Sequence, residues 1–292
     1  MSSNKTPQGV QILGSAAAEG NPAMFCDCEV CRKSWQNGGK DIRMRTCYKL
    51  NDRVRVDFGP DNLAQEYKFQ LHSERLEHLF FTHSHEDHME EILISYRGAY
   101  FSHPVPGSVL KIYGSAQTVS SLEEMLRKFR YVKNMEDLQL ELVPLKMFQP
   151  CEIGSEDMTV WALPADHMKD DPAKQPVIYV MRCGKKYLLI ANDTGYFDDC
   201  VWDFLAAQDF KFDIVIADCC FGTRDCPHGH MGGQTSLDVK NRLAEMGKLS
   251  PDCQYIVNHF SHNCGGVHAD FEAYFNPHGI EVGYDGMEIF FK

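Results

Sequence analysis

The chain has 292 residues, of which 43% are hydrophobic, 24% are charged and 11% are aromatic. This composition suits a folded globular protein and excludes a disordered chain, a collagen and a small disulfide-stapled fold. Asp and Glu number 41 against 29 Lys and Arg, for a net charge of -12, which disfavours a broad face for a long nucleic acid. A small phosphorylated substrate stays possible, because bound metal ions can reverse the potential of an acidic pocket.

No stretch approaches the ~18 continuous apolar residues of a membrane span. Residues 1–20 lack the charged start and apolar core of a secretory signal. We therefore expect a cytoplasmic protein with reduced thiols and no membrane partner. In a reducing compartment, 12 cysteines favour metal binding over disulfides.

Short runs rich in β-branched and apolar residues recur along the chain and predict strands. They cover Val10–Leu13, Val54–Asp57, Leu79–Thr82, Leu110–Tyr113, Met158–Leu163, Val177–Met181, Tyr187–Ala191, Asp213–Ala217, Tyr255–Asn258 and Met287–Phe291. Several runs, such as YLLIA and DIVIA, are apolar without interruption, which is typical of strands buried on both faces.

Helical patterns lie between these strands, at Ser120–Tyr131, Phe197–Ala207 and Leu237–Leu249. Ser120 stands three residues before Glu123, and Thr235 three before Asp238, a spacing typical of helix starts. Because strands outnumber the helices scattered among them, we expect a layered α/β protein with large sheets, forming a single domain over residues 1–292.

Residues of metal-binding types follow three of the predicted strands. The segment 83–88 follows the strand at 79–82, Asp193 follows the strand at 187–191, and His259 follows the strand at 255–258. Functional side chains in layered α/β proteins tend to lie on loops at one end of the sheets. The three strand ends therefore predict one shared site.

The segment His83-Ser84-His85-Glu86-Asp87-His88 contains three histidines and an aspartate. Side-chain direction alternates in an extended turn, so His83 and His85 point the same way while Asp87 and His88 can face a second point. Two ions roughly 3.5–4 Å apart would share these ligands if another carboxylate bridged them. Imidazole and carboxylate suit zinc, manganese or iron without selecting firmly among them.

This segment matches the HxHxDH motif of the metallo-β-lactamase superfamily. The later landmarks of the family follow in order, as Ala165-Asp166-His167, Asn192-Asp193-Thr194-Gly195 and Asn258-His259. The resemblance covers nearly the whole chain and implies an αβ/βα four-layer sandwich with two divalent ions in the active site. It implies one ion on His83, His85 and His167, a second ion on Asp87, His88 and His259, and Asp193 bridging the two together with a hydroxide. The chain departs from the family where Met89-Glu90-Glu91-Ile92 follows the motif, which affects the pocket wall and the substrate more than the ligands.

A loop at about residues 20–45 contains three thiols within six residues, on Cys26, Cys28 and Cys31. Thiolates at this spacing converge on one tetrahedral ion and need a fourth ligand, for which His262 is the candidate. A closed Cys3His zinc would stabilise the fold and take no part in the chemistry. The alternative is a loop of three reduced cysteines with no ion.

The loop and its flanks, at residues 13–23 and 38–45, resemble the PhnP-type phosphodiesterases, which act on phosphoribosyl 1,2-cyclic phosphate. Those proteins have a comparable CxCxxC zinc loop, completed by a histidine three residues beyond the last active-site histidine. His259 and His262 have that spacing. The PqqB-like branch of the superfamily also has this loop, so it narrows the subfamily without identifying the substrate.

These features favour a metal-dependent hydrolase, a phosphodiesterase that cleaves a small cyclic or nucleotide-like phosphodiester with a metal-bridging hydroxide. The leaving oxygen needs a proton, and His230 is the candidate donor because its glycine-flanked loop resembles the HM(S/G) loop of phosphodiesterases in this superfamily. Asp87 is predicted to be a catalytic residue together with His230, and His228 is a candidate substrate-binding residue. A hydrogen bond to the loop's own backbone is the alternative role for either histidine. Asp218 is either an acceptor that orients a ligand histidine or a structural carboxylate.

Two other functions stay open. One is hydrolysis of a lactone or thioester on the same dinuclear site, and the other is a PqqB-like role without hydrolysis. A tRNA-processing nuclease is disfavoured by the charge of -12 and by the lack of a long basic insertion, and a β-lactamase by the lack of an export signal. We expect a small phosphorylated substrate as the partner, no long nucleic acid, and a homodimer as an open alternative to a monomer.

Overall fold

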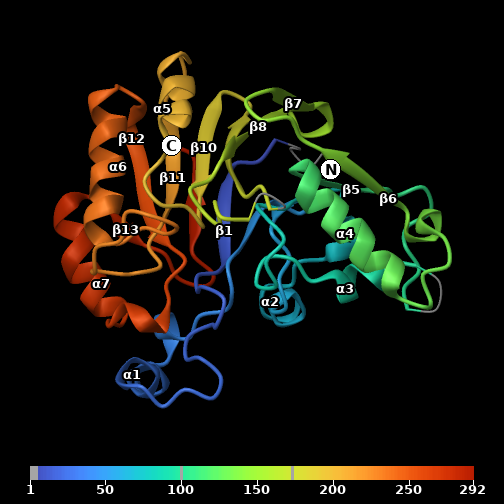
Figure 1. Cartoon of the computed structure of the whole chain (residues 1–292), viewed down its shortest axis with the longest axis horizontal. Helices are drawn as coiled ribbons and strands as arrows, with labels where there is room; N and C mark the ends of the chain where they lie inside the picture. The colour runs from blue at the N-terminus through green and yellow to red at the C-terminus, as the bar shows by residue number, and fades with distance from the viewer. Residues whose placement is uncertain (1–5, 99–100, 172–173) are drawn as a thin grey trace.

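The computed structural model describes residues 6–98, 101–171 and 174–292, and its strands form two seven-stranded sheets (Figure 1). The first sheet contains, in spatial order, β14 (Glu288–Phe290), β1 (Gly9–Gly14), β2 (Cys47–Asn51), β3 (Val54–Val56), β4 (His78–Phe80), β5 (Leu110–Gly114) and β6 (Leu140–Pro144). The second contains β13 (Glu281–Val282), β12 (Leu249–Asn258), β11 (Phe212–Asp218), β10 (Lys186–Ala191), β9 (Val177–Cys183), β8 (Met158–Pro164) and β7 (Pro150–Ile153).

Helices cover the outer face of each sheet. The α-helices in the described residues are α1 (Glu29–Asn37), α2 (Asn62–Phe69), α3 (Glu91–Ser95), α4 (Ala116–Lys128), α5 (Asp199–Ala206), α6 (Gly233–Glu245) and α7 (His268–Phe275). Side chains of α3 and α4 pack against the first sheet, and those of α5, α6 and α7 pack against the second. The helix α1 belongs to a lobe that extends away from the sandwich (Figure 1). This arrangement confirms the four-layer α/β sandwich expected from the sequence. None of the helices in the described ranges is long and apolar enough to cross a membrane.

The strand β10 shows why continuous apolar runs fit the inner layers. Leu188 and Ile190 pack into the cluster between the two sheets, whereas Leu189 and Ala191 pack into the cluster under the helices. Because successive side chains point to opposite faces, a strand with an apolar layer on both sides needs apolar residues at every position.

Parallel pairing brings the carboxyl ends of several strands to one edge. β10, β11 and β12 pair in parallel, with Ala191 opposite Ala217 and Asp218 opposite Asn258. In the first sheet, β3 and β4 pair in parallel as well, with Val56 opposite Phe80. The residues that follow these strands therefore meet at the same end of the sandwich.

Two predicted helix starts are wrong. The helix α4 begins at Ala116 and not at Ser120, because the Ser115 hydroxyl accepts the Thr118 amide at 3.2 Å and caps the helix five residues earlier. The helix α6 begins at Gly233, so that Thr235 lies inside its first turn, and it ends at Glu245. Leu249, the predicted end of that helix, is instead the first residue of β12.

The boundaries of other elements also differ from the prediction. The strand β4 ends at Phe80, two residues before the predicted end at Thr82. The strands β2, β6, β7 and β13 and the helices α1, α2, α3 and α7 were not predicted. Residues of β6 and β7 are mostly half-buried or exposed, because these strands lie at the sheet edges.

Candidate metal centre

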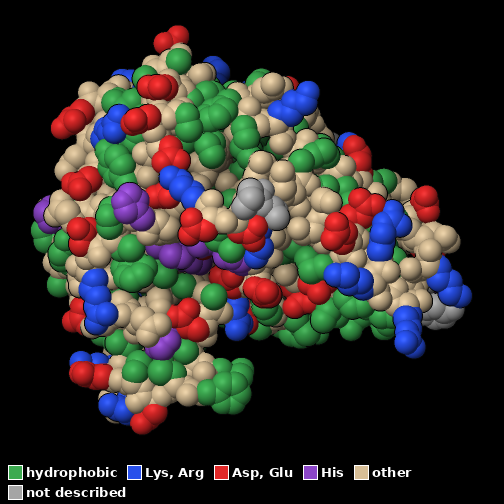
Figure 2. Space-filling view, viewed as in Figure 1, with side chains coloured by type: hydrophobic (Ala, Val, Ile, Leu, Met, Phe, Trp, Pro, Cys, Tyr) green, Lys and Arg blue, Asp and Glu red, His purple; other side chains and the backbone are tan. Residues whose placement is uncertain are grey.

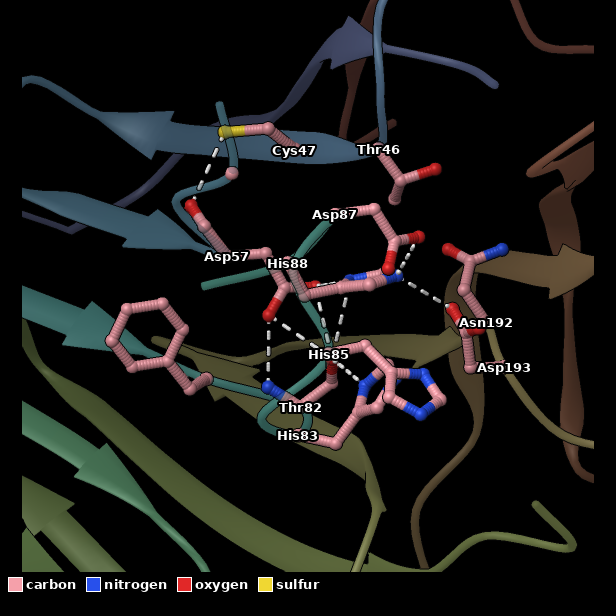
Figure 3. Close-up of polar contacts among 12 residues, drawn as sticks. Thr46, Cys47, Asp57, Thr82, His83, His85, Asp87, His88, Asn192 and Asp193 are labelled. Atoms are coloured by element: carbon pink, nitrogen blue, oxygen red, sulfur yellow. Dashed lines mark hydrogen bonds and ion pairs between the residues drawn. The ribbon is translucent and has the colours of Figure 1, made fainter. Parts of the chain in front are cut away.

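Loops that follow β4, β8, β10 and β12 bring the predicted metal-binding side chains together between the carboxyl ends of the two sheets. Figure 3 shows the residues contributed after β4, from His83 to His88, beside Asp193, which follows β10. Beyond β4 the chain stays extended, and the Thr82 carbonyl accepts the Val177 amide of the second sheet at 2.9 Å. This bond places His83 where the two sheets meet. Figure 2 shows histidine side chains in a recess near the centre of this face, with acidic side chains along its rim.

Two of the strand ends turn sharply at the residue that enters the site. Asp193 and His259 both have left-handed backbone angles, with φ of 53° and 69°. A non-glycine residue rarely adopts this conformation, and such strain is commonly retained where it positions a functional side chain. Here it directs both side chains into the recess.

Three histidines form one group whose ligand nitrogens lie within 4.8 Å of one another: His83, His85 and His167. The Nδ1 atom of His85 lies 2.8 Å from Nε2 of His83 and 3.4 Å from Nε2 of His167. Burial is the main cause that lowers the pKa of each of these histidines, so all three tend to be neutral. Neutral imidazole is the form that binds metal ions.

A second group contains Asp87, His88 and His259, and Asp193 lies between the two groups. The Asp193 carboxylate approaches Nε2 of His88 at 3.0 Å and Nε2 of His259 at 3.2 Å. It also lies 3.9 Å from Nε2 of His167. One carboxylate thus faces ligand atoms of both groups, which is the position that a bridging ligand would occupy.

The donor set fits a divalent cation. The buried atoms Nε2 of His88 and Oδ2 of Asp193 have no hydrogen bond of proper geometry, although they lie 3.0 Å apart. Buried polar atoms normally have such a partner. Burial acts to lower the pKa of His88, but Asp87, Asp193 and Asp57 outweigh it and hold that pKa well above its usual value. In the protein alone a proton on His88 balances this negative charge, and a bound cation would do so in its place.

Further side chains hold the ligands in place. Asp57 lies 2.7 Å from Nδ1 of His88 and also accepts the Thr82 amide at 2.8 Å (Figure 3). Thr46 lies 2.9 Å from Nδ1 of His259. These contacts leave Nε2 of each histidine to face the site. Neither Asp57 nor Thr46 was predicted to take part in the site. Asp57 ends the predicted strand at 54–57, and this position at a strand end was the available signal.

Asp218 lies at the end of β11 and is fully buried. Its side chain accepts the amides of Asp193 at 2.9 Å and of Met231 at 2.8 Å, and lies 3.2 Å from Nδ1 of His230. It therefore orients His230 and the turn that carries Asp193, and not one of the predicted ligand histidines. The ring nitrogen of His230 lies 4.0 Å from the Asp193 carboxylate, so the predicted proton donor adjoins the cluster.

His228 stands apart from the cluster. Its side chain is 85% exposed, and its Nδ1 lies 3.3 Å from the Asp166 carboxylate. Its predicted role in substrate binding stays a prediction.

The four predicted ligands of the structural zinc also converge. Their ligand atoms, on Cys26, Cys28, Cys31 and His262, lie within 4.8 Å of one another. The Nδ1 atom of His262 is 3.6 Å from the Cys26 sulfur and 3.5 Å from the Cys28 sulfur. Burial acts to raise the pKa of Cys28, but bonds from the Cys31 amide and His262 outweigh it and lower that pKa to about 6. A thiolate is the form that binds zinc, so this group fits a zinc ion.

The comparisons with known proteins agree with the fold. The family model described as the β-lactamase superfamily domain matches residues 52–249. No curated protein sequence matches the chain.

Several solved structures share the fold over nearly the whole chain. A new diphosphatase from the PhnP family is 22% identical with a TM-score of 0.71, over 96% of this chain and 95% of that one. Zinc-bound PqqB from Methylobacterium extorquens is 15% identical with a TM-score of 0.70, over 96% and 99%. The short form of human tRNase Z is 16% identical with a TM-score of 0.62, over 97% and 99%.

Proposed function

The chain belongs to the metallo-β-lactamase superfamily of metal-dependent hydrolases, and on this basis we propose that it cleaves a small cyclic or nucleotide-like phosphodiester. The observation that carries the proposal is the position of His230. It adjoins a cluster suited to two cations and is held there by the buried carboxylate of Asp218.

In this proposal one ion is held by His83, His85 and His167, and the other by Asp87, His88 and His259, with Asp193 shared. When bound, two such ions would activate water as the nucleophile and neutralise the negative charge of a phosphodiester. The protein fixes these side chains through contacts outside the metal positions. Asp57 contacts His88, Thr46 contacts His259, and Asp218 accepts the Asp193 amide. A preorganised site of this kind does not have to rearrange during the reaction.

His230 supplies the proton that the leaving oxygen requires. Burial acts to lower the pKa of His230, but Asp218 and Asp193 outweigh it and raise that pKa to about 9. The ring is then protonated at neutral pH, with Nδ1 donating to Asp218, and the proposal assigns the proton on Nε2 to the substrate. As the bond between phosphorus and the leaving oxygen breaks, the proton on Nε2 passes to that oxygen. General acid catalysis of this kind contributes about 10²–10⁴-fold.

The charge of the protein supports a small substrate. The net charge is -12, and acidic side chains surround the recess (Figure 2). A long polyanion would have to approach this negative surface along its whole length, whereas a single phosphodiester would meet it only beside the cations.

The test compares four substrate classes on protein reconstituted with manganese, zinc or iron. These are bis-(p-nitrophenyl) phosphate, 2′,3′-cyclic nucleotides, a lactone and a thioester. We expect hydrolysis of the two phosphodiesters. Absence of that hydrolysis with all three metals would refute the proposal, and turnover of the lactone or thioester alone would favour the alternative hydrolase.

A second measurement tests the role of His230. A nitrophenolate leaves without much protonation, whereas the ribose alkoxide released from a cyclic nucleotide needs a proton. The His230→Ala variant should therefore lose more activity on the cyclic nucleotide, by about 10²–10⁴-fold, than on the nitrophenyl ester, while its metal content is unchanged. The His228→Ala variant, from the same loop, is compared with it, because a role in substrate binding alone predicts a similar loss on both substrates. An equal loss on both substrates would contradict the assignment.

A further inference from the structure

A third group of ligand atoms adjoins the proposed metal centre. The Cys220 sulfur and ring nitrogens of His230 and His259 lie within 4.8 Å of one another. Cys220 follows β11 by two residues and is 9% exposed. His259 also belongs to the group with Asp87 and His88, so the two groups overlap at one imidazole.

The surroundings of Cys220 favour a positive ion. The Cys220 amide donates to the Asp218 carboxylate at 3.0 Å, and the Asp193 carboxylate lies 3.2 Å from Nε2 of His259. Both carboxylates are buried, and their field would stabilise a cation beside the Cys220 sulfur. A cation at this point would displace the thiol proton to solvent and bind the thiolate.

We propose that Cys220, His230 and His259 form an alternative position for a thiophilic divalent ion such as Zn²⁺. One sulfur and two imidazole nitrogens suit zinc or cadmium, with water as a fourth ligand, whereas manganese prefers oxygen ligands and does not select this set. Because His259 can bind only one ion through its site-facing nitrogen, occupation of this position competes with the second ion of the proposed centre.

This geometry has a consequence for activity that rests on the proposed function. An ion bound to either ring nitrogen of His230 excludes the doubly protonated imidazolium, which is the acid of the proposed reaction. Zinc above the amount that fills the two-ion centre would then inhibit hydrolysis, while manganese would not. Occupation of this position by zinc would thus inhibit the enzyme reversibly.

The neighbouring cysteine provides a matched control. Cys219 is fully buried, and its sulfur faces the Gly222 carbonyl at 3.4 Å. Substitution of Cys219 changes an adjacent thiol of the same loop without removing a member of the group formed by Cys220, His230 and His259. The conservative Cys220→Ser variant accompanies Cys220→Ala, because a hydroxyl fills the space of the thiol and is a poor zinc ligand.

The first experiment titrates zinc into the manganese-loaded full chain and measures hydrolysis of bis-(p-nitrophenyl) phosphate, each variant relative to its own manganese rate. We expect zinc to inhibit wild type and Cys219→Ala. In Cys220→Ala and Cys220→Ser the zinc concentration for half-inhibition should rise at least about 10-fold. Loss of a side chain that only supports a ligand typically lowers metal affinity by about 10–100-fold, and loss of the ligand itself should lower it at least as much. Equal zinc sensitivity in all four proteins would overturn the inference.

The second experiment has a readout independent of activity. Cobalt replaces the active-site ions while zinc stays in the Cys3His loop, and the absorption of wild type is compared with that of Cys220→Ala. We expect a sulfur-to-cobalt charge-transfer band in wild type that is absent from Cys220→Ala and retained in Cys219→Ala. Identical spectra would overturn the inference. The band without any phosphodiester hydrolysis would refute the proposed function and leave the ion position supported.

Discussion

Replacement of Asp218 by Asn tests how the protein holds its proton donor. Four hydrogen-bond donors meet the Asp218 carboxylate, the amides of Asp193, Cys220 and Met231 and the ring of His230. An amide keeps one oxygen and turns its NH2 group toward two of those donors. Each buried donor without an acceptor costs about 1–3 kcal/mol, so the free energy of unfolding should fall by roughly 2–6 kcal/mol.

The same substitution changes the pH dependence of catalysis. Among the charges that raise the pKa of His230 to about 9, Asp218 has the largest effect. At pH 7.5 a group with that pKa is about 97% protonated, whereas one at the ordinary value of 6.5 is about 9% protonated. Because the reaction needs the protonated ring, the rate falls as pH rises through the pKa of His230. In Asp218→Asn this fall should begin at lower pH, and a full return of the pKa to 6.5 would reduce the rate roughly 10-fold at pH 7.5.

The assay is the pH–rate profile of hydrolysis of a 2′,3′-cyclic nucleotide, measured below the unfolding midpoint of each protein. Bound cations lower the pKa of His230 in both proteins. The measured quantity is therefore the difference in pH between the falling limbs of the wild-type and Asp218→Asn profiles. Asp225→Asn is the control, because it removes one negative charge from the same loop at an exposed position. A uniform loss of rate with an unmoved profile would show that Asp218 acts on stability alone and would refute the reasoning.

Three other substitutions test the two metal sites. Asp193→Asn removes the charge of the shared carboxylate, so elemental analysis should find fewer than two active-site ions and activity should fall with them; full activity with both ions would contradict the bridging role. Asp57→Asn weakens the support of His88 and should reduce affinity for the second ion by about 10–100-fold in a chelator competition, and an unchanged affinity would count against that support. Cys31→Ser should lose the loop zinc and lower the unfolding midpoint by roughly 4–8 °C, as expected for about 2 kcal/mol; a zinc content equal to wild type would exclude Cys31 as a ligand.

The sequence predicted the inner strands well because their burial leaves a local signal. The four residues from Leu188 to Ala191 are all apolar, because two of them pack between the sheets and the other two pack under the helices. Helix starts left a weaker signal. Both Ser115 and Ser120 can cap a helix, and Ser115 does so because the apolar stripe of α4 already includes Val119.

The convergence of the candidate metal-binding residues was predictable for a different reason. His83 to His88 are concentrated in one segment, and the other ligands follow runs that read as strands. Asp57 lies at the end of a predicted strand but in no motif, and Thr46 lies in no predicted element. Their roles arise only when β3 and the loop before β2 pack against the ends of β4 and β12, and such contacts depend on tertiary packing.

The two metal sites depend on each other through one short segment. His259 faces the proposed catalytic ions, and His262, three residues later, closes the Cys3His group. Between them Phe260 is fixed to the strand end of β1, since its amide donates to the Ser15 carbonyl at 2.9 Å and its carbonyl accepts the Ala17 amide at 3.0 Å. A rotation of this segment would move His259 but none of the three histidines of the first ion position, which come from the β4 and β8 loops. The zinc loop therefore supports the second ion position more than the first, and this second position is also the one with which Cys220 competes.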